Sequence, residues 1–182
     1  MASETLLDLS QVRSARQHFQ RAYDPTALGP AAEDYRLVGP VTLAFDIFKS
    51  NREFRLTGRL QAAIELPCGR CLEPFAIAID EPFDLMYLPH SANTGQGEIE
   101  IEEDDLETAY YSDEVIDLGH MMHEQFYLAL PMKPLCTEAC RGLCPQCGIN
   151  LNHGRCDCAP AWTDPRLEVL RGLIPPSGEP SQ

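Results

Sequence analysis

Eight cysteines are the residues of this sequence whose type and spacing indicate chemistry. They come in four close pairs: Cys68/Cys71, Cys136/Cys140, Cys144/Cys147 and Cys156/Cys158. Partners this close suit a shared metal ion better than disulfides, which stabilise most when they close long loops. Structural zinc prefers thiolate ligands at the corners of a tetrahedron. The spacing therefore predicts structural Zn²⁺, one or two ions per chain.

The eight sulfurs divide into two sets of four. Cys144-Pro-Gln-Cys147-Gly has the sequence of a zinc knuckle, a tight turn whose backbone N–H groups face both sulfurs and whose glycine takes a positive φ. With the C-x-C pair that follows, it predicts a compact site, the ribbon cluster: Cys144, Cys147, Cys156 and Cys158. The other four form the clip cluster, which would fasten the C-terminal part to a sheet: Cys68, Cys71, Cys136 and Cys140.

Two alternatives stay open for these ligands. Cys68 and Cys71 can be buried or free thiols in a β-turn, and His153 lies inside the ribbon loop, where it can replace one sulfur. We expect His153 to face solvent, because four cysteines already complete the site.

The sequence predicts that the chain is not an enzyme. Sites filled by four thiolates lack the open position that catalytic zinc keeps for water. His120-Met-Met-His123-Glu124 fits neither order of the zinc-peptidase helices, and we expect these side chains on the outer side of a helix. The sequence contains no glycine-rich phosphate loop.

The net charge of −14 comes almost entirely from one stretch of the chain. Residues 91–130 contain eleven Asp or Glu and no Lys or Arg. Such a stretch repels nucleic-acid phosphates and attracts basic proteins. We predict that a basic partner docks on the acidic stretch, which consists of Glu98, Glu100, Glu102, Glu103, Asp104 and Asp105. A solubilising loop is the alternative interpretation.

Hydrophobic periodicity predicts the elements that position these groups. Alternation predicts strands at 41–48 and 54–66, and again at 75–80 and 83–88, with an exposed edge strand at 98–102. Helical spacing predicts helices at 11–23, with Ser10 as N-cap, at 116–130 and at 166–173.

Together these elements predict an α+β fold. Its core is an antiparallel β-sheet or partial barrel, with an N-terminal helix, one packed helix and a C-terminal cysteine-rich zinc module. We divide the chain into a sheet domain with helices at 1–130, a zinc-binding cysteine module at 131–160, and a short helix with a disordered tail at 161–182.

The sequence predicts a cytoplasmic protein without a membrane partner. No apolar run approaches the roughly 18–20 residues of a membrane helix. The acidic N-terminal sequence lacks the basic start and apolar run of a secretory signal. A reducing compartment agrees with cysteines that bind metal instead of forming disulfides.

The segment Leu66-Pro-Cys-Gly-Arg-Cys-Leu-Glu-Pro-Phe75 resembles the YceD family, the large ribosomal RNA subunit accumulation proteins of bacteria and plastids. The family's pattern is a strand that leads into C-x-R-C-L-x-P. Similar segments follow in the family's order: the helix of residues 116–132, the cysteine-rich residues 135–152, and then residues 156–167. The resemblance runs from about residue 35 to residue 173.

The resemblance implies an accessory factor in ribosome biogenesis that promotes synthesis, processing or accumulation of large-subunit (23S) ribosomal RNA. The expected partner is a basic ribosomal protein or assembly factor, with an indirect association with 23S rRNA. Only the cysteines are carried over as site residues, and no catalytic residue comes with them. The alternative is a zinc-thiolate interaction or redox-sensing module unrelated to ribosomes, whose exposed thiolates release metal on oxidation.

Overall fold

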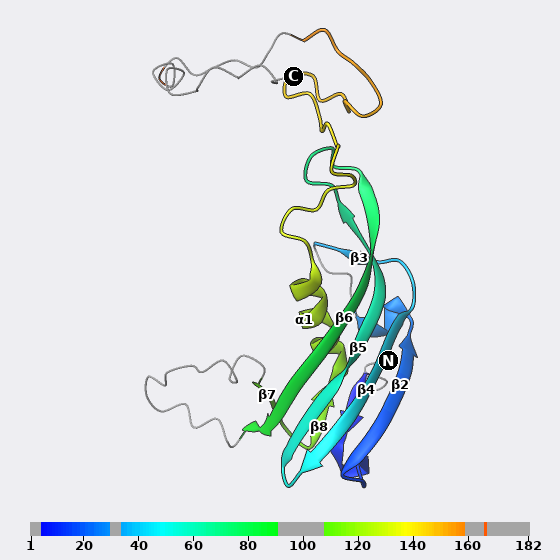
Figure 1. Ribbon diagram of the computed structural model, residues 1–182, viewed down its shortest axis with the longest axis vertical. Coiled ribbons are helices and arrows are strands. Elements are labelled where there is room, and N and C mark those ends of the chain that lie inside the picture. Colours follow the sequence, from blue (N-terminus) through cyan, green and yellow to red (C-terminus); the bar gives the residue numbers. More distant parts are fainter. Residues whose placement is uncertain (1–4, 30–33, 91–107, 159–165, 167–182) are drawn as a thin grey trace, which may run out of the picture.

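A computed structural model describes residues 5–29, 34–90, 108–158 and 166 (Figure 1). Its elements in chain order are β1 (Leu6–Asp8), the 3₁₀ turn η1 (Leu9–Gln11), β2 (Arg16–Tyr23), the 3₁₀ turn η2 (Pro25–Leu28), β3 (Arg36–Leu37), β4 (Val41–Ser50), β5 (Glu53–Pro67), β6 (Pro74–Pro89), β7 (Thr108–Tyr111), β8 (Val115–Asp117) and α1 (Leu118–Ala129). The predicted edge strand at 98–102, the acidic stretch, and the predicted C-terminal helix beyond Arg166 with its tail lie outside the described residues.

One long sheet forms the body of the molecule. Its strand order is β2-β4-β5-β6-β7, and β3 pairs with part of β5. All of its pairs are antiparallel except β6 with β7, which is parallel. A separate two-stranded sheet joins β1 to β8 and leads the chain into α1. The predicted antiparallel sheet is therefore confirmed for its central strands. The edge strand β7 differs, because it runs parallel to β6, whereas neighbouring strands of a meander are antiparallel.

The core lies between one face of the sheet and α1. Alternate residues of β4 are at most 1% exposed, and they point toward the helix side: Val41, Leu43, Phe45 and Ile47. The packed helix predicted at 116–130 is confirmed as α1, whose Met121, Met122 and Phe126 are also at most 1% exposed. The opposite face of the sheet carries cross-strand ion pairs such as Arg55–Asp84 at 2.6 Å and Arg59–Asp80 at 2.8 Å.

Gly58 allows β4 and β5 to approach closely in the middle of the sheet. A Cβ atom at this position would lie 2.4 Å from the carbonyl oxygen of Ala44 and 2.5 Å from Cβ of Phe45. No side chain fits at these distances, so the sheet needs glycine here.

The predicted N-terminal helix at 11–23 is wrong. Most of that segment is β2, which pairs with β4 along eight residues. Phe19 stacks on Phe45 of β4, with ring centroids 5.3 Å apart, and Arg16 pairs with Asp46 at 2.8 Å. The predicted N-cap Ser10 instead lies in η1, which Asp8 caps by accepting from the backbone N–H of Ser10. Pairing with the free edge of β4 outweighs the weak helical spacing of the segment.

None of the described helices is long and apolar enough to cross a membrane. The division into three domains stays a prediction.

Candidate metal centre

The clip cluster joins the tip of the β5–β6 hairpin to the chain that follows α1. Cys68 and Cys71 lie in the turn of this hairpin, which extends beyond the other strands (Figure 1). After α1, Pro131 and Pro134 interrupt helical structure, and the chain runs to the hairpin tip, where it brings Cys136 and Cys140.

Main-chain hydrogen bonds hold the two segments of the clip cluster together. The N–H of Gly69 donates to the carbonyl of Pro134 at 2.7 Å, and the N–H of Leu143 donates to the carbonyl of Arg70 at 3.1 Å. The Arg70 guanidinium donates to the carbonyl oxygens of Cys140 at 2.8 Å and Glu138 at 3.3 Å. Gly142 permits this approach, because a Cβ there would lie 3.0 Å from the Arg70 carbonyl and its φ is +73°.

The sulfur positions of the clip cluster match a tetrahedral zinc site. All four Sγ atoms lie within 4.8 Å of one another. The Sγ atoms of Cys68 and Cys140 are 3.8 Å apart, and those of Cys71 and Cys136 are 3.7 Å apart. A tetrahedron with Zn–S bonds of about 2.3 Å has sulfur–sulfur edges of about 3.8 Å. Three of these cysteines are at most 3% exposed and Cys136 is partly buried, so most of the site is shielded from solvent.

Backbone donors at the clip cluster favour one thiolate strongly. The N–H groups of Cys136, at 3.4 Å, and of Cys71 face the Cys68 sulfur and lower the pKa of Cys68 to about 6. The N–H of Glu73 favours the Cys71 thiolate, but burial and the neighbouring thiols outweigh it and raise the pKa of Cys71 to about 12. Four thiolates this close repel one another, and a dication between them offsets that repulsion.

The ribbon cluster forms within one short segment of chain. Its four Sγ atoms also lie within 4.8 Å of one another. The expected knuckle turn is present: Gly148 has φ +74°, its N–H donates to the carbonyl of Cys144, and the Cys144 N–H donates to the carbonyl of Ile149, both at 2.9 Å. Cys144 is buried, whereas Cys147 is exposed. One thiol of the ribbon cluster therefore faces the protein while another faces solvent.

The electrostatics of the ribbon cluster repeat those of the clip cluster. The N–H groups of Cys147 and Gln146 lower the pKa of Cys144 to about 6. The Cys147 thiol, followed by burial, raises the pKa of Cys158 to about 12. In both clusters the first cysteine of a C-x-x-C pair has its pKa lowered to about 6 because backbone N–H groups point at its sulfur. For Cys144 these donors belong to its own turn, whereas for Cys68 the largest contribution comes from the N–H of Cys136, across the cluster.

The structure places the sequence-predicted site residues as follows. It brings the eight cysteines together in the two expected sets of four, and that they bind metal stays a prediction. The imidazole of His153 is 70% exposed and lies 3.2 Å from the carboxylate of Glu73, outside both clusters. The acidic stretch lies outside the described residues.

His120 and His123 are not placed as a pair. His120 lies 3.5 Å from Glu124 on the exposed side of α1, as expected. His123, expected on the outer side, is half-buried: its Nδ1 is 2.6 Å from the Tyr35 hydroxyl and its Nε2 is 2.9 Å from the carbonyl of Leu28. Residues three apart on a helix lie on neighbouring faces, and here only His120 faces solvent.

Two residues that support the thiols, Arg70 and Asn152, were not among the predicted site residues. Asn152 donates from Nδ2 to the Cys140 sulfur at 3.3 Å and accepts the N–H of Arg141 at 2.7 Å. Arg70 makes the carbonyl contacts described above. Its place between two cysteines in C-x-R-C was the available signal, whereas nothing in the sequence indicates Asn152.

Comparisons with known proteins point to one family. The family model described as "Large ribosomal RNA subunit accumulation protein YceD" matches residues 56–174. A relative named "Large ribosomal RNA subunit accumulation protein YCED homolog 1, chloroplastic" from Arabidopsis thaliana is 28% identical over an alignment of 147 residues, and the match covers 69% of this chain and 46% of that protein. The protein of the same name from Zea mays is 29% identical over an alignment of 158 residues, and the match covers 74% of this chain and 54% of that protein.

Mycobacterial relatives carry no functional name. An uncharacterized protein of Mycobacterium tuberculosis is 33% identical over an alignment of 128 residues, and the match covers 64% of this chain and 59% of that protein. The chain thus spans about half the length of the curated relatives it matches. No solved structure matches.

Proposed function

Because the chain belongs to the YceD family of large ribosomal RNA subunit accumulation proteins, we propose that it is an accessory factor in ribosome biogenesis. In this role it promotes the synthesis, processing or accumulation of 23S ribosomal RNA. The single observation that carries the proposal is the family match over residues 56–174, which includes most of β5, all of β6 and α1, and all eight cysteines.

Two structural Zn²⁺ ions belong to this proposal, and the donor sets fit them. The clip cluster and the ribbon cluster each offer four sulfurs within 4.8 Å, the number and spacing that a tetrahedral ion requires. Bound zinc would neutralise part of the thiolate charge and would fix the cysteine-rich segment to the hairpin tip.

We propose that the protein acts without catalysing a reaction. Four sulfurs at each ion leave no position for a water molecule that could be activated as a nucleophile. The protein would then act by binding, and its charge indicates the partner. The eleven acids and no Lys or Arg of residues 91–130 suit a basic ribosomal protein or assembly factor, with rRNA reached indirectly.

We place this role in the cytoplasm, where we expect the ribosomal partner to be found. The printed names of the two plant relatives assign those proteins to chloroplasts.

Deletion of the gene tests the proposed function. We expect large-subunit rRNA to fall relative to small-subunit rRNA, with a deficit of large subunits on sucrose gradients, and we expect a plasmid copy to restore both. An unchanged rRNA ratio and normal gradient profiles, including in cells grown in the cold, would contradict the proposal. Release of metal from the purified protein by mild peroxide at physiological thiol levels would then favour the redox-sensing alternative.

A further inference from the structure

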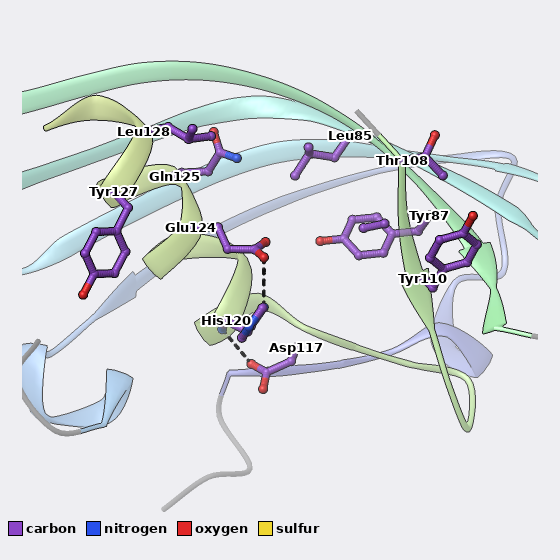
Figure 2. A pocket seen from close by; sticks show the side chains of 11 residues that line it. Leu85, Tyr87, Thr108, Tyr110, Asp117, His120, Glu124, Gln125, Tyr127 and Leu128 are labelled. Carbon is purple, nitrogen blue, oxygen red and sulfur yellow. Dashed lines mark hydrogen bonds and ion pairs between the residues drawn. The ribbon is translucent and has the colours of Figure 1, made fainter. Parts of the chain in front are cut away.

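A groove of about 720 Å³ lies between α1 and the strands β6 and β7 (Figure 2), and no cysteine lines it within the described residues. Tyr87 of β6 and Tyr110 of β7 line it on the strand side. The start of α1 lines it on the other side, with Asp117, His120 and Glu124. We call this feature the Tyr87 groove.

The Tyr87 hydroxyl is the polar end of a buried side chain that lines the Tyr87 groove. Tyr87 is 6% exposed, and Figure 2 shows its hydroxyl directed toward the side of the groove where Glu124 lies. No hydrogen bond to this hydroxyl is formed by the residues that the structure describes. Burial, and then the carboxylates of Glu124 and Asp117, raise the pKa of Tyr87, so the phenol stays neutral and its oxygen can accept a hydrogen bond.

Among Asp, Glu, Lys and Arg, only carboxylates line the Tyr87 groove within the described residues, and His120 is the other titratable polar side chain there besides the tyrosines. Asp117 and Glu124 contribute carboxylates, and none of the described lining residues is a Lys or Arg. Asp117 caps α1 by accepting the N–H of His120 at 3.0 Å, and Glu124 lies 3.5 Å from His120. Each of these contacts uses one oxygen, which leaves acceptor sites for a further donor. The groove therefore suits a cation.

Apolar side chains surround these acceptors. Leu128 is 79% exposed, Tyr127 is 48% exposed and Tyr110 is 45% exposed, and all three line the Tyr87 groove. The long methylene stems of Lys and Arg pack on such surfaces while their charged ends reach polar partners. Tyrosine rings also attract a cation placed over their faces.

We propose that the Tyr87 groove binds Lys or Arg side chains of an extended segment of a basic protein. The proposal rests on the proposed function, because it identifies where a basic ribosomal protein or factor contacts this chain. The aliphatic stem lies against Leu85 and Leu128, and the charged end donates to Glu124, Asp117 and the Tyr87 oxygen. An RNA strand does not fit this chemistry, because its phosphates would face two carboxylates.

Binding of a labelled peptide of alternating Lys and Ser to the full chain tests the proposal by fluorescence anisotropy. A peptide with Glu in place of Lys and a single-stranded RNA oligonucleotide are the comparison probes. Tyr87→Phe removes the hydroxyl but keeps the buried ring, and we expect it to weaken Lys-peptide binding about three- to tenfold. Glu124→Gln keeps the shape but removes the charge, and we expect binding to weaken about two- to fivefold.

Glu138→Gln is the matched control for charge. Glu138 is exposed in the cysteine-rich segment, and its backbone carbonyl, not its carboxylate, accepts from Arg70. We expect this variant to bind the Lys peptide as the unchanged protein does. Any binding of the peptide to other acids of the chain is common to all variants and can only reduce the difference between them, so a difference that is observed reports on the groove. Equal thermal unfolding temperatures of the variants show that folding is unaffected.

Equal affinity of all variants for the Lys peptide, no binding at low salt, or a preference for RNA that these substitutions remove would each overturn the groove proposal. If the peptide fails to bind while gene deletion lowers large-subunit rRNA, the groove proposal is wrong and the proposed function stands. If the peptide binds through Tyr87 while deletion leaves the rRNA ratio unchanged, the ribosomal identity of the partner is overturned.

Discussion

At the scale of single residues, the two cysteine clusters have the same sulfur spacing but differ in how the surrounding chain supports them. Arg70 binds two carbonyl oxygens of the segment that carries Cys136 and Cys140, and Asn152 reaches the Cys140 sulfur. The ribbon cluster instead relies on its own knuckle turn and on the left-handed conformation of Gly148. The clip cluster thus depends on contacts that are distant in sequence, whereas the ribbon cluster is nearly self-contained.

The two clusters are expected to lose metal independently. Protein purified without chelator should contain close to two equivalents of zinc by elemental analysis, and less than about half an equivalent would contradict the metal interpretation. Cys68→Ser should reduce the content to about one equivalent, and Cys144→Ser should do the same, because each removes one thiolate from a different ion. Each variant is the control for the other. Loss of both equivalents in either variant would show that the clusters are coupled.

At the scale of elements, the β5–β6 hairpin carries the link between the sheet and the cysteine-rich segment. Phe75 packs against the buried core of the sheet and also against the buried cysteines of the clip cluster. The apolar core under α1 and the thiol sites therefore share one side chain, but each has its own source of stability. Apolar burial stabilises the sheet, and metal binding is expected to stabilise the cysteine-rich segment.

The sequence predicted elements well where one signal dominated. Strict alternation in β4 and β5, and four-residue spacing in α1, each placed one apolar face against the core. The segment that became β2 contains both helical and alternating spacing, and its partner β4 lies about 25 residues away in sequence, where local propensity cannot detect it. The parallel pairing of β6 with β7 is equally non-local.

The cysteine clusters and the Tyr87 groove also differ in how well the sequence predicts them. The close spacing of cysteine pairs predicts shared metal ligands, so the two sets of four could be proposed from the sequence alone. The Tyr87 groove could not, because Tyr87, Tyr110 and Glu124 come from three elements and each is ordinary in its own segment.

Zinc chelation is expected to unfold the cysteine-rich segment while the sheet stays folded. Treatment with a strong zinc chelator should remove hydrogen-exchange protection from residues 136–158, because structural metal binding and local folding are coupled. The paired amides of β4 and β5 should stay protected, since their core residues such as Leu43 and Leu56 are fully buried without any help from the cysteines. Readdition of Zn²⁺ should restore the protection. Simultaneous loss of protection in the sheet would show that the clip cluster holds the whole fold together.

At the scale of the whole molecule, negative charge is distributed unevenly along the chain, as the cysteines are. The sheet carries its Arg side chains largely in ion pairs, such as Arg16–Asp46 and Arg36–Glu65, and these leave little net field. The excess negative charge belongs to residues 91–130, which join β6 to β7 and continue through α1. The cysteines and the excess negative charge therefore belong to different stretches of the sequence.

Charge reversal tests whether the acidic stretch recruits the partner. Replacing its six acids, Glu98, Glu100, Glu102, Glu103, Asp104 and Asp105, with Lys changes the formal charge of the chain from −14 to about −2. We expect loss of the basic protein recovered with the unchanged chain from cells in low salt, while binding to an RNA oligonucleotide is kept or improved. Salt sensitivity alone cannot decide, because exposed charges are screened beyond about 8 Å at physiological ionic strength for either partner. If the reversed chain still recovers the same basic protein, the acidic stretch only keeps the protein soluble, and the partner must bind elsewhere.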